Sequence, residues 1–121
     1  MDRRLIAALL AFGLAGTASA AECNAQGGQQ LFETKCGACH ALNENRVGPH
    51  LAGVVGRRAG SVADFGYTPD LANANLTWNA EQLDEFLSGP AKKFPGTAMA
   101  FGGLRKTEDR QAVVCFLSQQ K

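Results

Sequence analysis

Residues 36–40 read CGACH, which places two thiols three positions apart and an imidazole directly after the second thiol. Such a stretch can form a redox-active disulfide, bind a metal or attach a cofactor covalently. Cys-x-x-Cys-His is the attachment motif of c-type haem, in which both thiols bond to the porphyrin and the histidine becomes an axial ligand of the iron. The motif therefore predicts covalent haem attachment at Cys36 and Cys39, with His40 as the proximal ligand.

Two other kinds of site also use paired cysteines. A thioredoxin-like redox pair lies in a βαβ setting, and this chain shows no strand pattern. A structural zinc site needs a second pair of ligands, whereas the only other histidine is His50, and Cys23 and Cys115 are not spaced as a pair. Haem attachment is therefore the favoured interpretation.

The opposite side of such a haem is either open or occupied by a second ligand. Beyond residue 20, Met99 is the only methionine, and it lies in the proline- and glycine-bounded segment FPGTAMAF. Methionine is often a filler of apolar cores, but close to a haem motif its thioether is a candidate sixth ligand. His50 is the alternative, although it follows His40 by only ten residues and would have to reach the opposite face of the haem.

The first twenty residues, MDRRLIAALLAFGLAGTASA, combine two arginines, an apolar run and an Ala-Ser-Ala end. This pattern predicts a secretory signal peptide over residues 1–20 and no membrane anchor, because a bilayer span needs about 20 apolar residues. Export through the general route leads to an oxidising compartment, the bacterial periplasm. Residues 21–121 then form one domain with equal numbers of acidic and basic side chains, which gives no support for nucleic-acid binding.

Helices are expected at both ends of residues 21–121, with loops between them. Gly28, Phe32 and Cys36 recur every fourth residue and predict a helix over about residues 25–36. Residues 41–66 contain five glycines and no period, which predicts a loop long enough to wrap around a large cofactor. The other predicted elements are a short helix with Thr68 as N-cap and Pro69 as its first residue, a helix over residues 79–88 that starts with capping-box spacing at Asn79 and Gln82, a loop over residues 91–103, and a last helix with Thr107 as N-cap and Val113, Phe116 and Leu117 on its apolar face.

Several separated blocks of the chain resemble class I cytochromes c, specifically bacterial relatives of the mitochondrial protein. The blocks are GGQQLF before CGACH, VGPHLAGVVGRRAG, YTPDLANANLTW, FLSGPAKKFPGTAMAF and VVCFL. The likeness extends over essentially all of residues 21–121. It implies an all-α, single-domain class I cytochrome c fold in which the N- and C-terminal helices cross and loops wrap around one covalent haem c. Gly28 and Phe32 would then meet Val113 and Phe116.

The resemblance also implies roles for residues around the haem. His40 and Met99 would be the two axial ligands, and the Pro49 carbonyl would accept a hydrogen bond from the other ring nitrogen of His40. Donors would approach the propionates, because buried carboxylates without partners are costly; each of these residues has an alternative role in the core or at the surface. The implied pocket residues besides the ligands are Pro49, Arg57, Tyr67, Trp78, Thr97 and Phe101.

An iron with both axial positions filled has no place for a substrate, so the expected function is one-electron transfer by a soluble periplasmic carrier, not an enzyme. The expected partners of this monomer are redox proteins of the membrane or periplasm: a quinol-oxidising complex, a terminal oxidase, a reaction centre or a dehydrogenase, as in a respiratory chain. One alternative is a haem enzyme or gas-sensing cytochrome with a labile sixth ligand. Another is a dedicated electron-transfer subunit of one dehydrogenase or oxidase.

Electron carriers dock through small interfaces that charge often steers. The resemblance places basic side chains around the exposed haem edge, and here the ring is thinned because Ala91 and Ala98 stand where lysines are often found. The expected docking residues are Lys35, Lys92, Lys93, Arg105 and Lys106.

Cys23 and Cys115 have no expected haem role. Cys23 lies just before the first predicted helix and Cys115 lies inside the last, and the resemblance implies that these helices cross. A disulfide between them is therefore one interpretation, and a small buried side chain at Cys115 is the other.

Overall fold

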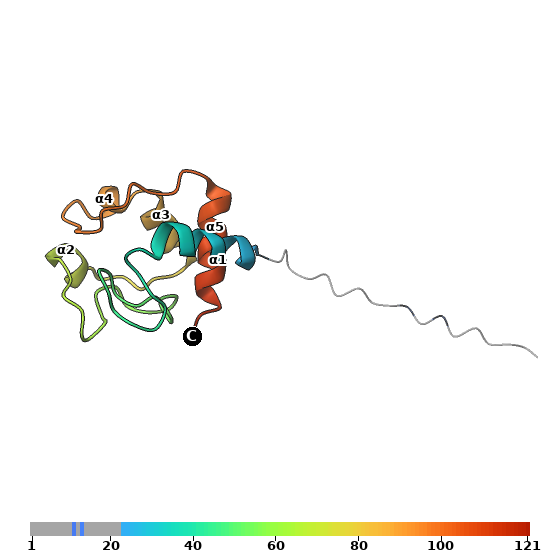
Figure 1. The fold of residues 1–121 in the computed structure, drawn as a ribbon, viewed down its shortest axis with the longest axis horizontal. Helices are drawn as coiled ribbons and strands as arrows, with labels where there is room; N and C mark the ends of the chain where they lie inside the picture. The colour runs from blue at the N-terminus through green and yellow to red at the C-terminus, as the bar shows by residue number, and fades with distance from the viewer. Residues whose placement is uncertain (1–10, 12, 14–22) are drawn as a thin grey trace, which may run out of the picture.

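The computed structural model describes residues 11, 13 and 23–121, so the predicted signal peptide lies outside the described residues except at positions 11 and 13 (Figure 1). Residues 23–121 contain no strand, only one isolated bridge between Arg58 and Thr77. None of the described helices is long and apolar enough to cross a membrane. The expected all-α, single-domain fold is confirmed; its elements are α1 (Ala25–Leu31), the π-helical turn η1 (Phe32–Cys36), α2 (Pro69–Ala72), α3 (Ala80–Ser88), α4 (Pro90–Lys93) and α5 (Thr107–Ser118).

The first and last helices, α1 and α5, cross each other (Figure 1). Gly28 permits the crossing, because a Cβ at this position would overlap the Ala112 carbonyl and lie 2.8 Å from Cβ of Phe116. One turn further along, the rings of Phe32 and Phe116 pack with their centroids 5.4 Å apart. The predicted contact between the two helices is confirmed.

Substitution of Gly28 by alanine is expected to destabilise the fold by about 1–3 kcal/mol, because the added methyl group must displace the backbone of α5. Chemical denaturation measures this as a lower midpoint. Gly66→Ala is the matched control, since a Cβ there meets nothing within 4 Å. Equal midpoints for the two variants would contradict the close helix crossing.

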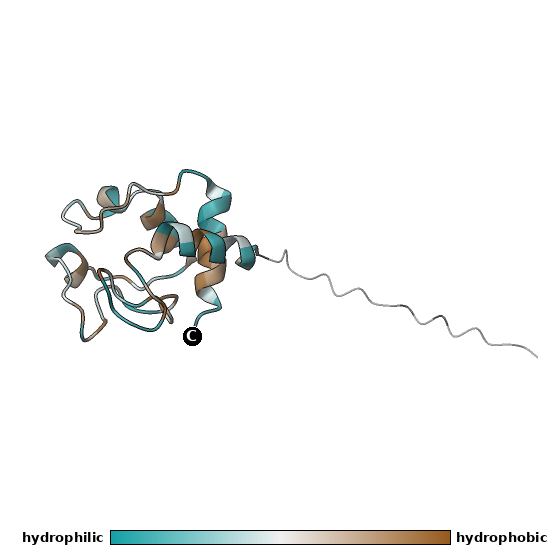
Figure 2. Ribbon diagram, in the orientation of Figure 1, coloured by the Kyte–Doolittle hydropathy of each residue, from teal (hydrophilic) through white to brown (hydrophobic). Residues whose placement is uncertain are grey.

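Two groups of apolar side chains form the core. Figure 2 shows the apolar residues of α5 gathered in its C-terminal half, where Val113 is only 1% exposed. The second group is aromatic: the ring of Trp78 lies 5.0 Å from Phe86 of α3 and 6.4 Å from Phe94, between ring centroids. The core therefore connects the helix crossing with the segment that follows α4.

Two helix boundaries differ from the sequence-based expectation. The loop predicted over residues 91–103 begins with a short helix, α4, because Pro90 occupies its first position, where no N–H is needed, and the amide of Phe94 donates to the Pro90 carbonyl. At α5, Thr107 is the first helical residue and Lys106 is the N-cap, since the amides of Asp109 and Arg110 both donate to the Lys106 carbonyl.

Residues 41–66 form no helix, as predicted, and hydrogen bonds to distant segments hold them in place. The amide of Gly56 donates to the Trp78 carbonyl at 2.6 Å, and the amide of Trp78 donates to the Arg57 carbonyl at 2.8 Å. Gly53 donates from its amide to the carbonyl of Gln120 at 2.8 Å, next to the C-terminus. These contacts fix the loop against both the core and the last helix.

Cys23 and Cys115 form a disulfide with their Cα atoms 5.7 Å apart. The bond joins residues that are 92 positions apart in the chain. Cys115 is buried within α5, while Cys23 is exposed just before α1. The disulfide therefore closes nearly the whole described chain into one loop at the helix crossing.

Candidate haem-binding site

The CGACH stretch begins where the first helix widens into a π turn. In η1 the amide of Gly37 donates to the carbonyl of Phe32, five residues earlier, and the amide of His40 then donates to the Cys36 carbonyl. Single π turns are frequent at functional sites. Cys36 is the last residue of η1 and Cys39 follows three residues later; both are free thiols, Cys36 half-buried and Cys39 exposed. Burial raises the pKa of the Cys36 thiol.

The ring of His40 is oriented by the backbone. Its Nδ1 lies 2.8 Å from the carbonyl oxygen of Pro49, and since a carbonyl only accepts, Nδ1 carries the proton and Nε2 is left to bind a metal. Burial lowers the pKa of His40, the Pro49 carbonyl opposes this effect, and the charge of Arg57 adds to the lowering. The lowered pKa favours the neutral imidazole, which is the form that binds a metal.

Gly48 makes room for this ring. A Cβ at position 48 would overlap the imidazole of His40, while the amide of Gly48 donates to the Cys39 carbonyl at 2.9 Å. The loop after CGACH therefore folds back on His40, so that Gly48 lies against the ring and the Pro49 carbonyl binds its Nδ1.

Met99 lies in the irregular segment between α4 and α5. Its side chain is half-buried against the core, and its amide donates to Oγ1 of Thr97 at 3.1 Å. Phe101 is also half-buried against the core, and its amide donates to the Met99 carbonyl at 3.0 Å. Thr97 thus positions the backbone of the methionine.

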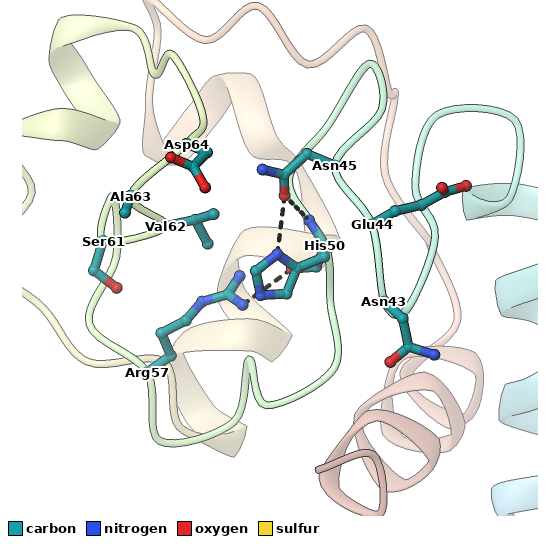
Figure 3. A pocket seen from close by; sticks show the side chains of 9 residues that line it. All are labelled: Asn43, Glu44, Asn45, His50, Arg57, Ser61, Val62, Ala63 and Asp64. Carbon is teal, nitrogen blue, oxygen red and sulfur yellow. Dashed lines mark hydrogen bonds between the residues drawn. The ribbon is translucent and has the colours of Figure 1, made fainter.

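Polar side chains gather around Arg57, at the cavity drawn in Figure 3. Nη1 of Arg57 donates to the carbonyl of His50 at 3.0 Å, and the cavity beside it has a volume of about 490 Å³. Burial lowers the pKa of Arg57, and the nearby Tyr67 opposes this shift. The Tyr67 hydroxyl accepts a hydrogen bond from the amide of Val62 at 3.1 Å. These groups place a half-buried positive charge beside a phenol.

His50 is engaged elsewhere in its own loop. Oδ1 of Asn45 lies 2.9 Å from both the amide and Nδ1 of His50 (Figure 3). The ring of His50 lines the cavity beside Arg57, whereas the preceding residue, Pro49, contacts His40 through its carbonyl. His50 thus belongs to the polar group around Arg57.

Trp78 is 6% exposed and packs in the aromatic core, with its backbone paired to Arg57 and Gly56. The hydroxyl of Thr68, directly after Tyr67, was not among the expected pocket residues. Its Oγ1 is buried and has no hydrogen-bond partner in the described residues, and a buried polar group of this kind needs one. The sequence indicates Thr68 only as a helix N-cap. Its position directly after Tyr67, an expected pocket residue, is the feature that could have indicated Thr68 as a pocket residue too.

The expected docking residues fall into two groups. Lys93 forms an ion pair with Glu85 at 3.0 Å, and its side chain is only 13% exposed, so its charge is largely neutralised. The other four are exposed: Lys35, Lys92, Arg105 and Lys106.

These residues fit a covalently attached haem. Two free thiols stand at the required spacing, the neutral imidazole has one nitrogen fixed and one unused, and a thioether lies in a segment packed on the same core. Arg57 and the unpartnered hydroxyl of Thr68 are suitable donors for carboxylates. In the part of the chain that the structure describes, no group of three or more His, Cys, Asp or Glu side chains could hold a bare metal ion, so a zinc site finds no ligand set there.

Comparisons with known proteins agree with this arrangement. The family model described as cytochrome c matches residues 25–121. The chain is 44% identical over 100 residues to a cytochrome c of Cochliobolus lunatus, covering 80% of this chain and 93% of that protein. It is 46% identical over 99 residues to a cytochrome c of Stellaria longipes, covering 79% of this chain and 92% of that protein.

Among solved structures, the fold is similar to cytochrome cH from Methylobacterium extorquens. The TM-score is 0.76 at 37% sequence identity, and the match covers 80% of this chain and 99% of that one. The family match covers all helices from α1 to α5, including the CGACH stretch. The chain therefore belongs to the cytochrome c family, whose members are electron carriers with covalently attached haem c.

Proposed function

We propose that this protein carries one haem c, bound through Cys36 and Cys39, with His40 and Met99 as axial ligands, and that it shuttles single electrons between redox proteins. The hydrogen bond between His40 Nδ1 and the Pro49 carbonyl supports the proposal most strongly, because it leaves Nε2 free and fixes the ring beside the two thiols. The chain contains one Cys-x-x-Cys-His motif, which supports a single haem.

When bound, the haem would supply a reversible one-electron couple. The residues of the chain set the conditions for it. His40 and Met99 would leave no site for a substrate, and apolar neighbours such as Phe101 would disfavour the extra charge of the oxidised state and so raise the reduction potential. The haem propionates would be surrounded by Arg57, Tyr67, Thr68 and Trp78. The positive charge of Arg57 would compensate the negative charge of the propionates.

The compartment follows from the predicted signal peptide over residues 1–20. Cleavage would release residues 21–121 into the periplasm as one domain. The disulfide between Cys23 and Cys115 supports an oxidising location, since such bonds persist outside the cytoplasm.

Absorption spectroscopy of the purified holoprotein tests the proposal. The ferric protein is expected to show the weak far-red band of a sulfur-to-iron bond and to bind added cyanide slowly and weakly. The ferrous protein is expected to resist carbon monoxide. A ferric protein without the band that binds cyanide readily would instead identify a haem enzyme or a gas sensor.

The four exposed basic residues are expected to steer docking to an acidic partner. Raising the ionic strength from low to physiological values should slow association by on the order of tenfold. Stopped-flow kinetics with an acidic redox partner measures the slope. Lys92→Ala should flatten this slope more than Lys93→Ala, because Lys93 is paired with Glu85. A rate that does not depend on salt would contradict steering by these charges.

A further inference from the structure

The segment that contains Met99, residues 95–103, is flanked by two buried residues. Phe94 is 9% exposed and Leu104 is 6% exposed. The hydrogen bonds within the segment are local: Thr97 donates to the adjacent Phe94 carbonyl, and Met99 and Phe101 bond to residues within the segment. Residues 95–103 belong to no helix or strand.

Within residues 23–121, a single hydrogen bond joins residues 95–103 to a distant part of the chain. The amide of Gly96 donates to Oδ2 of Asp70 at 2.7 Å, across 26 residues of sequence. A carboxylate acceptor makes such a bond shorter and stronger than a neutral one. Asp70 lies in α2, which faces the segment after α4 in Figure 1.

The short helix α2 is itself firmly placed. Gly60 approaches it so closely that a Cβ there would overlap the Leu71 carbonyl. The residues on either side of α2 are tied together, because the amide of Ala59 donates to the Leu76 carbonyl at 2.9 Å and Arg58 forms a bridge with Thr77. Asp70 is therefore a fixed point from which the Met99 segment can be held.

We propose that Asp70 is a positioning residue for Met99: its carboxylate binds the Gly96 amide and keeps residues 95–103 in the closed arrangement. The inference rests on the proposed role of Met99 as an axial ligand. Segments with few hydrogen bonds open locally more often than helices, so loss of this bond raises the population in which the methionine is displaced.

The position of Gly96 supports a specific contact. A Cβ at residue 96 would lie 2.8 Å from Oδ2 and 3.0 Å from Cγ of Asp70, so only glycine allows the carboxylate to reach the amide without a shift. Gly96→Ala therefore perturbs the same contact from the opposite side.

The test compares Asp70→Ala, Asp70→Asn and Glu108→Ala in the full ferric holoprotein. Imidazole is the probe, because it competes with a methionine for the sixth position. Asp70→Ala is expected to raise the imidazole affinity by about three- to tenfold, the factor that corresponds to the net worth of one hydrogen bond. Asp70→Asn keeps an acceptor oxygen and should restore most of the difference. Glu108→Ala removes an equal charge from an exposed residue of α5, for whose side chain the described chain offers no hydrogen bond, and should leave the affinity unchanged.

A second readout is independent of the iron ligand. Hydrogen exchange of the Gly96 amide, followed by NMR, should accelerate by a similar factor in Asp70→Ala while the denaturation midpoint shifts little. Unchanged exchange and unchanged imidazole affinity would overturn the inference, and so would equal effects of Asp70→Ala and Glu108→Ala. The two proposals can fail separately. Absence of the far-red band in the parent protein would refute the ligand role of Met99. Unaltered protection of the Gly96 amide in Asp70→Ala would refute the hydrogen bond, whatever the iron ligand is.

Discussion

Replacement of Met99 by alanine is expected to abolish the far-red band of the ferric protein, to open the sixth position to cyanide and imidazole, and to lower the reduction potential by on the order of 0.1–0.3 V. Axial ligands set haem potentials over about 0.8 V, and a thioether favours the ferrous state more than water or hydroxide does. No second methionine is available beyond residue 20 to replace it. Absorption spectroscopy with and without added cyanide or imidazole measures the first two effects, and a spectroelectrochemical titration measures the third.

Leu83→Ala is the matched control for this variant. Leu83 is 4% exposed in α3, so its truncation should cost about 2–5 kcal/mol of stability through lost packing while the band and the potential persist. A similar loss of the band in both variants would mean that general destabilisation, and not the loss of a ligand, is responsible. An unchanged band in Met99→Ala would refute the proposed ligation.

Removal of the disulfide by Cys23→Ser is expected to lower the free energy of unfolding by about 2–5 kcal/mol. The two cysteines are 92 positions apart, and a disulfide that closes a long loop stabilises most, because it restricts the unfolded chain most. Cys23 is exposed, so serine fills its place without leaving a cavity. Denaturant titration of the oxidised parent protein and the variant measures the difference, and the far-red band should be retained in both.

The partner residue provides a control for this experiment. Cys115 is 4% exposed in α5, so Cys115→Ala should cost somewhat more than Cys23→Ser, because it also removes a buried sulfur atom. The double variant should be no less stable than Cys115→Ala alone, since both changes break one bond. Additive losses would show that the two sulfurs stabilise the fold separately.

The sequence predicted those parts of the fold that depend on local spacing. The recurrence of Gly28 and Phe32 located the first helix, because helical period is visible in the sequence, whereas its contact with α5 was implied by the resemblance to class I cytochromes c. The CGACH stretch likewise identifies chemistry through spacing alone. The glycine-rich loop over residues 41–66 was predicted for the same reason, since it lacks any period.

Other features depend on pairings that local spacing does not reveal. The prediction of a loop over residues 91–103 misses α4, because Pro90 can either end one helix or begin the next, and spacing does not distinguish the two. Lys93 was expected at the docking surface, but whether Glu85 neutralises it depends on the turn between α3 and α4. The bond between Asp70 and Gly96 joins residues 26 positions apart on two irregular segments, and no pattern in either segment indicates the other.

The location of the four cysteines constrains how the chain can mature. Four thiols can form two disulfides in three ways. In the structure Cys23 is bonded to Cys115, while Cys36, the last residue of η1, and Cys39 remain thiols. An oxidising compartment also favours the short bridge between Cys36 and Cys39, which would block thioether formation. If the chain is exported and binds haem as proposed, its maturation requires that Cys36 and Cys39 be reduced while the bond between Cys23 and Cys115, which is buried at Cys115 in α5, stays oxidised.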